Sequence, residues 1–378
     1  CVGIWHVATD GSDSNPGSED APFATIQHAV DMASSDDTIL VHKGSYKENI
    51  NFGAKELSLL SEYIISKDPS DIENTIIDGD DLGSVLIISG GQAAAMRIEG
   101  FTITGGAAQL GGGIHISNIS RPTIRDVVVA NNKSDSFATT ECGGAGIYIG
   151  GSSSPLITNT IIRENATMGV GGGLCIDGGS KPTIINTAIY DNSTVDSGNW
   201  QAAHFHGAAF TIVGAHPTLI NCLIFDNEAT TDADGVWAYS NSTMELINST
   251  LSGHTQTALS AMGDCEIQLK NSIYWNNGEP PIGPVYFQHS ITQILPFTGQ
   301  GNATDDPLFT STNWKTDSLN LQSDSPAIDA GSADYLPPDE HDLDGDKDTS
   351  EPLPIDFAGN PRVQGTTVDI GAFEFQPE

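Results

Sequence analysis

The sequence predicts an all-β fold, namely a right-handed parallel β-helix with an N-terminal capping helix and an irregular C-terminal tail. Three observations favour this fold. The 378 residues include 41 glycines and only 17% charged residues, a composition that suits short strands separated by turns. A phrase of eleven residues recurs along the chain. A second, Gly-led phrase recurs between its copies.

The first phrase ends in an Ile-rich strand and carries Asn or Asp at its centre. The gap-free copies are 122–132, 155–165, 182–192 and 217–227; residues 244–254 and 267–277 continue the series, and 96–106 resembles its start. Stacked amides at one position can hydrogen-bond along the axis and stabilise a bend. The central column is Asp126, Asn159, Asn186, Asn221, Asn248 and Asn271.

The second phrase supplies the other strand of each repeat. Its copies are 111–117, 144–150, 171–177, 207–213 and 235–240. Each unit is then a Gly-led strand, a polar turn, an Ile-rich strand bent at Asn, and a loop of variable length. Such a unit cannot bury an apolar face alone, so we expect coils stacked about 4.8 Å apart.

Both ends of the chain resemble known β-helix proteins. Residues 6–50 predict a strand, a Gly/Asp loop, an amphipathic helix from about 24 to 34 and a second strand, as at the start of many pectate-lyase-like proteins. The helix would cap the open core. The stretches "DSPAIDAGS" (324–332), "DLDGDKD" (342–348) and "DIGAFEF" (369–375) resemble the tail of bacterial surface-associated β-helix proteins. That resemblance implies a calcium-dependent or anchored surface protein.

The resemblance covers nearly the whole chain and implies a fold without implying one activity, because this scaffold carries lyases, hydrolases, epimerases and adhesins. We expect residues 1–60 to form the cap and first coil, 61–300 the β-helix coils, and 301–378 an acidic tail packed on the last coils.

Charge and cysteines limit the partners. A net charge of −35 repels nucleic acid and anionic lipid, whereas it suits divalent cations. No apolar run has the roughly 18 residues of a membrane span. The five cysteines lack zinc spacing, and their odd number leaves at least one unpaired. Cys1 is interpreted either as a cloning boundary or as a lipid-modified cysteine after signal cleavage. We expect a monomer that is secreted or held at a bacterial cell surface, with a lipid anchor at Cys1 under the second interpretation.

Equivalent positions in successive coils should be neighbours in space. In the Gly-led strands side chains alternate between the two faces, so the residue after each inward one faces outward. This predicts an outward column of His115, Tyr148, Cys175 and Thr211. In the Ile-rich strand an outward column places Tyr190, Phe225 and Trp275 near Arg163. These aromatic rings suggest a sugar-stacking face. The alternative is that long loops fold over the stripe and hide it.

The next column contains three successive carboxylates, Glu164, Asp191 and Asp226. Like charges one coil apart are unfavourable unless a cation lies between them or one is protonated. We therefore consider a Ca²⁺ site and an acid/base set for glycoside hydrolysis. An ordinary solvated turn is the third interpretation.

The long insertions share one repeat position, at 133–142, 193–206 and 228–234, so we expect them on one side of the solenoid. They carry Glu141, Trp200, His204, His206, Asp232 and Asp234. The pair His204 and His206 could bind a metal, act as a base or charge neutraliser toward an acidic sugar, or only form hydrogen bonds.

The tail motif "DLDGDKD" has oxygen ligands at alternate positions around Gly345 and resembles the start of an EF-hand loop. Glu351 comes too early for the terminal ligand of such a loop. The motif is interpreted either as a Ca²⁺ site or as an acidic turn. Its four carboxylates are Asp342, Asp344, Asp346 and Asp348.

These features together predict an extracellular carbohydrate-active protein, a polysaccharide lyase or a glycoside hydrolase, with its site on the loop edge around residues 141–206. The alternatives are a non-catalytic, Ca²⁺-stabilised adhesin or glycan-binding protein and, on the His pair and Met residues, copper handling. The scarcity of basic residues weighs against a polyanionic substrate. The predicted catalytic residues are His204, His206, Asp191, Arg163 and Tyr148. The predicted substrate-binding residues are Trp200, Tyr190, Phe225, Trp275 and His115. The predicted metal ligands are Glu164, Asp191, Asp226, Asp342, Asp344, Asp346 and Asp348.

Overall fold

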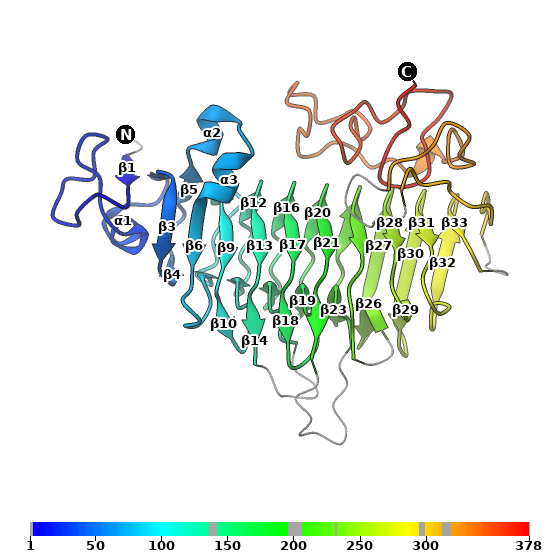
Figure 1. The fold of residues 1–378 in the computed structure, drawn as a ribbon, viewed down its shortest axis with the longest axis horizontal. Helices are drawn as coiled ribbons and strands as arrows, with labels where there is room; N and C mark the ends of the chain where they lie inside the picture. The colour runs from blue at the N-terminus through cyan, green and yellow to red at the C-terminus, as the bar shows by residue number, and fades with distance from the viewer. Residues whose placement is uncertain are drawn as a thin grey trace.

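The chain forms an elongated solenoid whose strands lie across its long axis (Figure 1). The computed structural model describes residues 3–135, 142–195, 206–230, 233–294, 299–311 and 319–377. All strand pairs within its four sheets are parallel, and each sheet is built from one strand of each successive coil. The prediction of an all-β, parallel β-helix is confirmed.

Three long sheets form the walls of the solenoid, and a short one lies between the second and the third. The eleven-stranded sheet consists of β1 (Ile4–Val7), β2 (Thr38–Val41), β5 (Ser58–Ser61), β8 (Arg97–Glu99), β12 (Thr123–Arg125), β16 (Leu156–Thr158), β20 (Thr183–Ile185), β24 (Thr218–Ile220), β27 (Thr243–Ile247), β30 (Glu266–Lys270) and β32 (Val285–Gln288). The ten-stranded sheet consists of β3 (Gly44–Lys47), β6 (Thr75–Asp78), β9 (Thr102–Thr104), β13 (Val128–Ala130), β17 (Ile161–Arg163), β21 (Ala188–Tyr190), β25 (Leu223–Phe225), β28 (Thr250–Ser252), β31 (Ile273–Trp275) and β33 (Ile291–Thr292).

The Gly-led strands form the eight-stranded sheet, which consists of β4 (Ile50–Asn51), β7 (Leu86–Ile88), β11 (Ile114–Ile116), β15 (Ile147–Ile149), β19 (Leu174–Asp177), β23 (Phe210–Val213), β26 (Ala233–Tyr239) and β29 (Thr257–Ala261). The four-stranded sheet consists of β10 (Ala107–Ala108), β14 (Lys133–Ser134), β18 (Ala166–Thr167) and β22 (Ser193–Thr194). The strands that precede the first two long insertions in the chain, β14 and β22, both lie in this sheet.

Helices are few and short. The predicted cap is present as α1 (Ile26–Met32), which buries Ile26, Ala29 and Val30 against the first coil. Thr25 begins it by accepting a hydrogen bond from the backbone N–H of His28. The other helices are α2 (Tyr63–Ser66), α3 (Ser70–Asn74) and the 3₁₀ helix η2 (Ala333–Tyr335). Each helix in the described part of the chain is too short and too polar to cross a bilayer.

The core is a stack of aliphatic side chains inside the coils. Ile114, Ile147, Leu174 and Phe210, which the alternation of the Gly-led strands places inward, are all completely buried. Because strand residues alternate between the two faces, the residues that follow them point outward.

Asn residues hold the turns in two separate columns. The predicted central column adopts the left-handed conformation, with φ near 48° at Asn159 and Asn221, a conformation that Asn tolerates better than most residues. Some amides in it bond one another, as Asn221 Nδ2 does to Asn186 Oδ1 at 3.0 Å. A longer amide ladder, which sequence analysis missed, is completely buried at the next turn: Asn132, Asn165, Asn192 and Asn227, with 3.0 Å between successive side chains.

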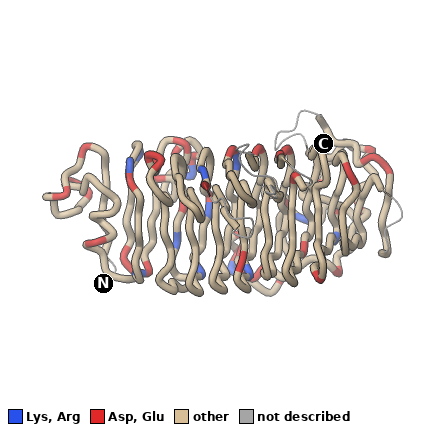
Figure 2. Tube along the Cα trace, turned by 90° about the horizontal axis from the view of Figure 1, so that it is seen from below, with Lys and Arg blue, Asp and Glu red and all other residues tan. Residues whose placement is uncertain are grey.

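The C-terminal segment lies along the outside of the last coils, on the same edge as α2 and α3 (Figure 1). Ala372 and Phe373 pack against Leu223 and Phe225 of β25, so the tail covers part of the ten-stranded sheet. Asp and Glu residues occur along the whole length of the solenoid, whereas Lys and Arg are few (Figure 2).

Candidate functional site

The outer surface of the eight-stranded sheet carries one continuous row of chemically useful side chains. The predicted column His115, Tyr148, Cys175 and Thr211 is in register, and β26 extends it with Trp237. Two residues further along each strand, a parallel row places Asp177, Val213 and Tyr239 side by side. We call His115, Tyr148, Asp177, His206, Trp237 and Tyr239 the aromatic–acid face.

Tyr148 and Asp177 form the polar centre of this face. The Tyr148 hydroxyl lies 3.0 Å from both carboxylate oxygens of Asp177 and donates its hydrogen bond to them. Burial raises the pKa of Asp177, while the Tyr148 hydroxyl and His115 act in the opposite direction. A partly buried carboxyl beside a phenol is a group that can hold or release a proton above the ordinary range of an aspartate.

His115 lies against the Tyr148 ring, with 5.0 Å between the ring centroids. Burial lowers the pKa of His115, so its imidazole is neutral at pH 7. Nδ1 lies 3.3 Å from the Leu110 carbonyl oxygen, which can only accept, so Nδ1 carries the proton. Nε2 then accepts from the Ser117 hydroxyl at 3.0 Å.

Aromatic rings continue the face toward the C-terminal coils. The Trp237 ring centroid is 4.6 Å from that of His206 and 4.4 Å from that of Tyr239. All three side chains are half-buried, so each retains an accessible surface. Burial and the charge of Asp177 raise the pKa of Tyr239, which links the rings electrostatically to the polar centre.

A disulfide between Cys142 and Cys175 fixes the start of this face, with 5.5 Å between the two Cα atoms. The two cysteines pack with Tyr148, Leu110 and Val213. Sequence spacing alone could not assign this pair. The remaining described cysteines, Cys222 and Cys265, are buried free thiols.

Of the residues predicted for the site, the structure brings together His115 and Tyr148. It places His206 further along the same sheet, against Trp237, which is three strands from Tyr148. The other two described residues predicted to be catalytic, Arg163 and Asp191, belong to the ten-stranded sheet and its following turn, on another wall of the solenoid. The prediction that all these residues share one edge is therefore corrected, because Arg163 and Asp191 lie at the ten-stranded sheet, whereas Tyr148 and His115 lie in the eight-stranded sheet. His204 and Trp200 lie outside the described residues, as do Glu141 and Asp232.

Asp234 was also expected on the loop edge, but it is completely buried. Its carboxylate accepts from the backbone N–H groups of Ala229 and Gln256 at 2.9 and 2.7 Å, so it holds a turn in place.

The aromatic stripe of the ten-stranded sheet is partly covered. Tyr190 and Phe225 stack with 4.7 Å between ring centroids, but Phe225 is only 1% exposed beneath Phe373. Trp275 packs in the adjoining apolar cluster. The prediction that Phe225 stacks on sugars is wrong. The tail covers Phe225, whereas Tyr190 and Trp275 are half-buried.

The carboxylate column of Glu164, Asp191 and Asp226 does not form a shared site. All three residues adopt the left-handed turn conformation, and Glu164 pairs with Arg163. Among the described residues, the acidic groups whose oxygens gather within 4.8 Å of one another lie elsewhere, which corrects the metal prediction for this column. Burial, and then the charge of Asp191, raise the pKa of Asp226 to about 6.

In the tail, carboxylate oxygens of Asp342, Asp344 and Asp346 do converge within 4.8 Å. Asp348 belongs to neither converging group, and its Oδ1 accepts from both the N–H and the hydroxyl of Ser350. The geometry therefore gives Asp348 no part in the predicted site. Carboxylate oxygens of Asp339 and Glu351 form a second group with Asp344. No sequence motif contained Asp339, and Glu351 was excluded because its spacing differs from that of an EF-hand loop.

Sequence analysis also missed Asp177, Trp237 and Tyr239. The signal was available, since "LCID" (174–177) and "VWAY" (236–239) continue the same in–out alternation that identified His115 and Tyr148. The outward column of the Gly-led strands was not continued into β26, whose register is irregular.

Comparison with known proteins agrees with the fold. A family model described as "Right handed beta helix region" matches residues 136–279. A crystal structure of the pectate lyase Pel9A superposes with a TM-score of 0.61, covering 99% of this chain and 96% of that chain at 14% identity. A pectin methylesterase from carrot gives a TM-score of 0.42 at 14% identity, covering 79% of this chain and 85% of that one. At such identities the likeness concerns the fold alone.

Sequence relatives carry no assigned activity. "Uncharacterized protein YwoF" of Bacillus subtilis (strain 168) is 26% identical over 165 residues, which is 44% of this chain and 28% of that protein. The chain thus spans less than a third of that relative's length. The family model described as "Protein of unknown function (DUF1565)" matches residues 9–207, more than half of the 378 residues. This chain therefore belongs to the DUF1565 family.

Proposed function

We propose that this protein binds a polysaccharide along the aromatic–acid face. The observation that carries the proposal is the cluster of half-exposed rings, His206, Trp237 and Tyr239. The hydrogen-bonded pair Tyr148 and Asp177 lies on the same sheet, with Val213 of β23 between Asp177 and Tyr239. Rings with an apolar face and polar edges suit the alternating C–H and O–H surfaces of a pyranose.

The charge of the face favours a neutral glycan. None of the eight strands of this sheet contains Lys or Arg, and the whole chain has a net charge of −35. Uronate elimination needs a group that neutralises the substrate carboxylate. We therefore favour binding or hydrolysis of a neutral glycan over lysis of an acidic one.

Glycoside hydrolysis is the second candidate, and Asp177 favours it. Its raised pKa suits a carboxylic acid that gives its proton to the glycosidic oxygen as that bond breaks. The water oxygen then bonds to the anomeric carbon and the water gives its proton to the Asp177 carboxylate, which restores the acid. Tyr148 would position the acid and His115 would hold the phenol ring in place.

We further propose that the protein works outside the cytoplasm, at a bacterial surface or in the medium. The Cys142–Cys175 disulfide supports this location, because disulfides persist in oxidising compartments and are rare in the cytosol.

Affinity electrophoresis against neutral and acidic polysaccharides tests binding. We expect retardation by at least one neutral glycan, and Trp237→Ala should weaken it at least tenfold, which corresponds to about 1.4 kcal/mol. Tyr286→Ala is the matched control, because Tyr286 is an exposed aromatic residue on the eleven-stranded sheet. Equal loss in both variants, or no retardation by any glycan, contradicts the proposal.

Release of reducing ends from the glycan that binds separates the two candidates. Hydrolysis predicts new reducing ends that disappear in Asp177→Asn while binding remains. Binding without product leaves the protein a glycan-binding module, and absorbance near 235 nm would instead reveal lysis.

A further inference from the structure

The acidic part of the tail forms a closed loop between two backbone contacts. Asp339 N–H donates to the Glu351 carbonyl at 2.8 Å, and Pro338 and Pro352 form an antiparallel bridge. Leu353 N–H then donates to the Pro337 carbonyl at 2.8 Å. These contacts return the chain to its starting point, so that Glu351 faces residues that precede it by more than one turn.

Carboxylates gather inside this loop in two groups that share Asp344. Oxygens of Asp339, Asp344 and Glu351 all lie within 4.8 Å of one another, and so do oxygens of Asp342, Asp344 and Asp346. Left-handed backbone at Asp342 and at Gly345, with φ of 51° and 83°, folds the loop around them. An acidic cluster alone has little meaning, because exposed carboxylates often lie near one another.

Two buried oxygens give the cluster a different meaning. The Asp339 side chain is only 1% exposed, and its Oδ1 has no hydrogen-bond partner, although Oδ2 accepts from Leu343 N–H at 2.8 Å. Glu351 Oε1 is likewise buried without a partner. Burying such an acceptor without a partner costs about 1–3 kcal/mol or more. Two of them on residues whose carboxylates converge with that of Asp344 would be stabilised by a positive charge.

We propose that Asp339, Asp344 and Glu351 hold a Ca²⁺ ion, with Asp342 and Asp346 completing its oxygen shell from the other side of Asp344. A hard cation with six to eight oxygen ligands in irregular geometry fits an all-carboxylate set. Mg²⁺ demands a more regular octahedron and keeps its waters, and the set offers no His or Cys for a softer metal. This inference is independent of the proposed glycan-binding function.

The ion would fasten the tail to the solenoid. Leu336, Leu343 and Leu353 flank the loop and pack against Ile185, Ile220 and Ile247 of the eleven-stranded sheet. Neutralising the carboxylates fixes the loop that positions these three leucines. Ca²⁺ should therefore stabilise the docked tail more than the coils.

Terbium luminescence and calorimetric titration with Ca²⁺ test the site. We expect saturable binding with a Kd of about 10⁻⁵ to 10⁻³ M, and a weaker response to Mg²⁺. Asp339→Asn and Glu351→Gln should each weaken binding at least about tenfold. Asp348→Asn, which removes the same charge from the same loop but belongs to neither group, should leave the Kd within about twofold.

The same variants have opposite effects on the tail with and without the ion. In chelator, Asp339→Asn and Glu351→Gln should slow proteolysis of the tail, because each removes an unpaired buried charge. In Ca²⁺ both variants should be cut faster than the unmodified protein. Absence of saturable binding up to about 10 mM Ca²⁺, or equal loss in Asp348→Asn and Glu351→Gln, would overturn the proposal; Glu351→Gln decides if Asp339→Asn does not fold.

Discussion

At the residue scale, position in the coil decides what each carboxylate does. Asp177 is half-buried against a phenol, Asp234 accepts backbone hydrogen bonds inside a turn, and Glu164 pairs with Arg163. Their sequence contexts look alike, since each is an acidic residue at or next to the end of a strand. A candidate catalytic acid therefore differs from a structural carboxylate only in the sheet or turn where it lies.

Asp226 gives a pH-dependent prediction. Its pKa is raised from 3.8 to about 6 by burial and by Asp191, so the folded state holds this proton more tightly than the unfolded state. Stability from this group is present at low pH and is lost as pH rises from 3.8 through about 6. Asp226→Asn should therefore raise the free energy of unfolding at pH 7.5 by about 1 kcal/mol, after allowance for solvent screening.

Urea titrations at two pH values check this result. At pH 3.5 the variant and the unmodified protein should be equal, since both then carry a neutral group. Asn is compatible with the left-handed backbone, because Asn131 and Asn276 occupy equivalent turns. Asp264→Asn, at an exposed turn, controls for net charge. An Asp226→Asn gain that is independent of pH contradicts the assigned cause.

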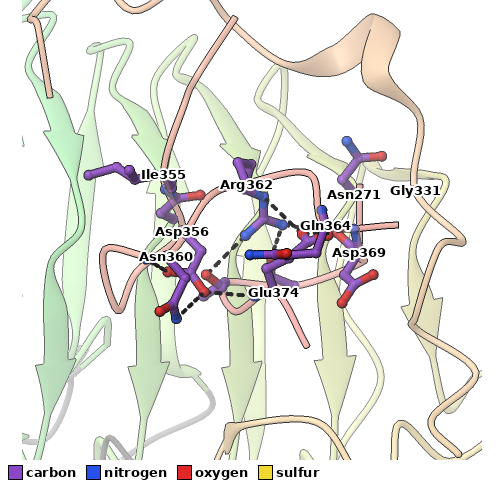
Figure 3. A network of polar contacts seen from close by, with 12 residues as sticks. Asn271, Gly331, Ile355, Asp356, Asn360, Arg362, Gln364, Asp369 and Glu374 are labelled. Carbon is purple, nitrogen blue, oxygen red and sulfur yellow. Dashed lines mark hydrogen bonds and ion pairs between the residues drawn. The ribbon is translucent and has the colours of Figure 1, made fainter. Parts of the chain in front are cut away.

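At the element scale, the C-terminal tail is fastened by a buried arginine. Arg362 is 1% exposed and donates to the carbonyl oxygens of Asp369, Gly371 and Ala372 at 2.7 to 3.1 Å. Figure 3 shows Arg362 among the tail residues Gln364, Asp369 and Glu374. With its amide oxygen turned toward the guanidinium, Asn248 of the β-helix accepts from Nε at 3.1 Å. Burial raises the pKa of Glu374 to about 7, while Arg362, 3.8 Å away, opposes the rise.

Arg362→Met should release the tail. It would leave three carbonyls and the buried Glu374 without their partner, a loss of about 3–5 kcal/mol. Limited proteolysis should then cut the C-terminal segment while the coils resist. Arg121→Met, at an exposed turn, is the control; a tail equally resistant in both variants would show that Arg362 does not hold it.

At the scale of the whole molecule, the repeat explains why the fold could be predicted. Coils are neighbours in sequence as well as in space, so the columns of Ile114 and Arg163 could be aligned by eye and are in register in the structure. The tail has no such regularity. Asn221 Nδ2 donates to the Ile355 carbonyl across 134 positions, and no local pattern signals that Phe225 will lie beneath Phe373.

The same difference between regular coils and an irregular tail explains which residues of the candidate site could be predicted. His115 and Tyr148 follow from alternation within the strands, and His206 follows from the shared position of the long insertions, so three of the six residues of the face were predicted. To predict Asp177, the alternation has to be continued to the next outward position of the same strand. To predict Trp237, it has to be continued into the irregular strand β26. The stacking role expected of Phe225 failed because it depended on what covers the sheet, which is a long-range property.

Hydroxyl-radical footprinting of the protein with and without a bound polysaccharide tests the central claim most directly. The account predicts that oxidation of Trp237, Tyr239 and His206 falls at least about threefold at saturation, since bound sugar removes their remaining exposure to water. Tyr286, on the eleven-stranded sheet, should be oxidised equally in both states. Protection of Tyr286 with unchanged oxidation of Trp237 and Tyr239 would contradict the assignment of the glycan to this face.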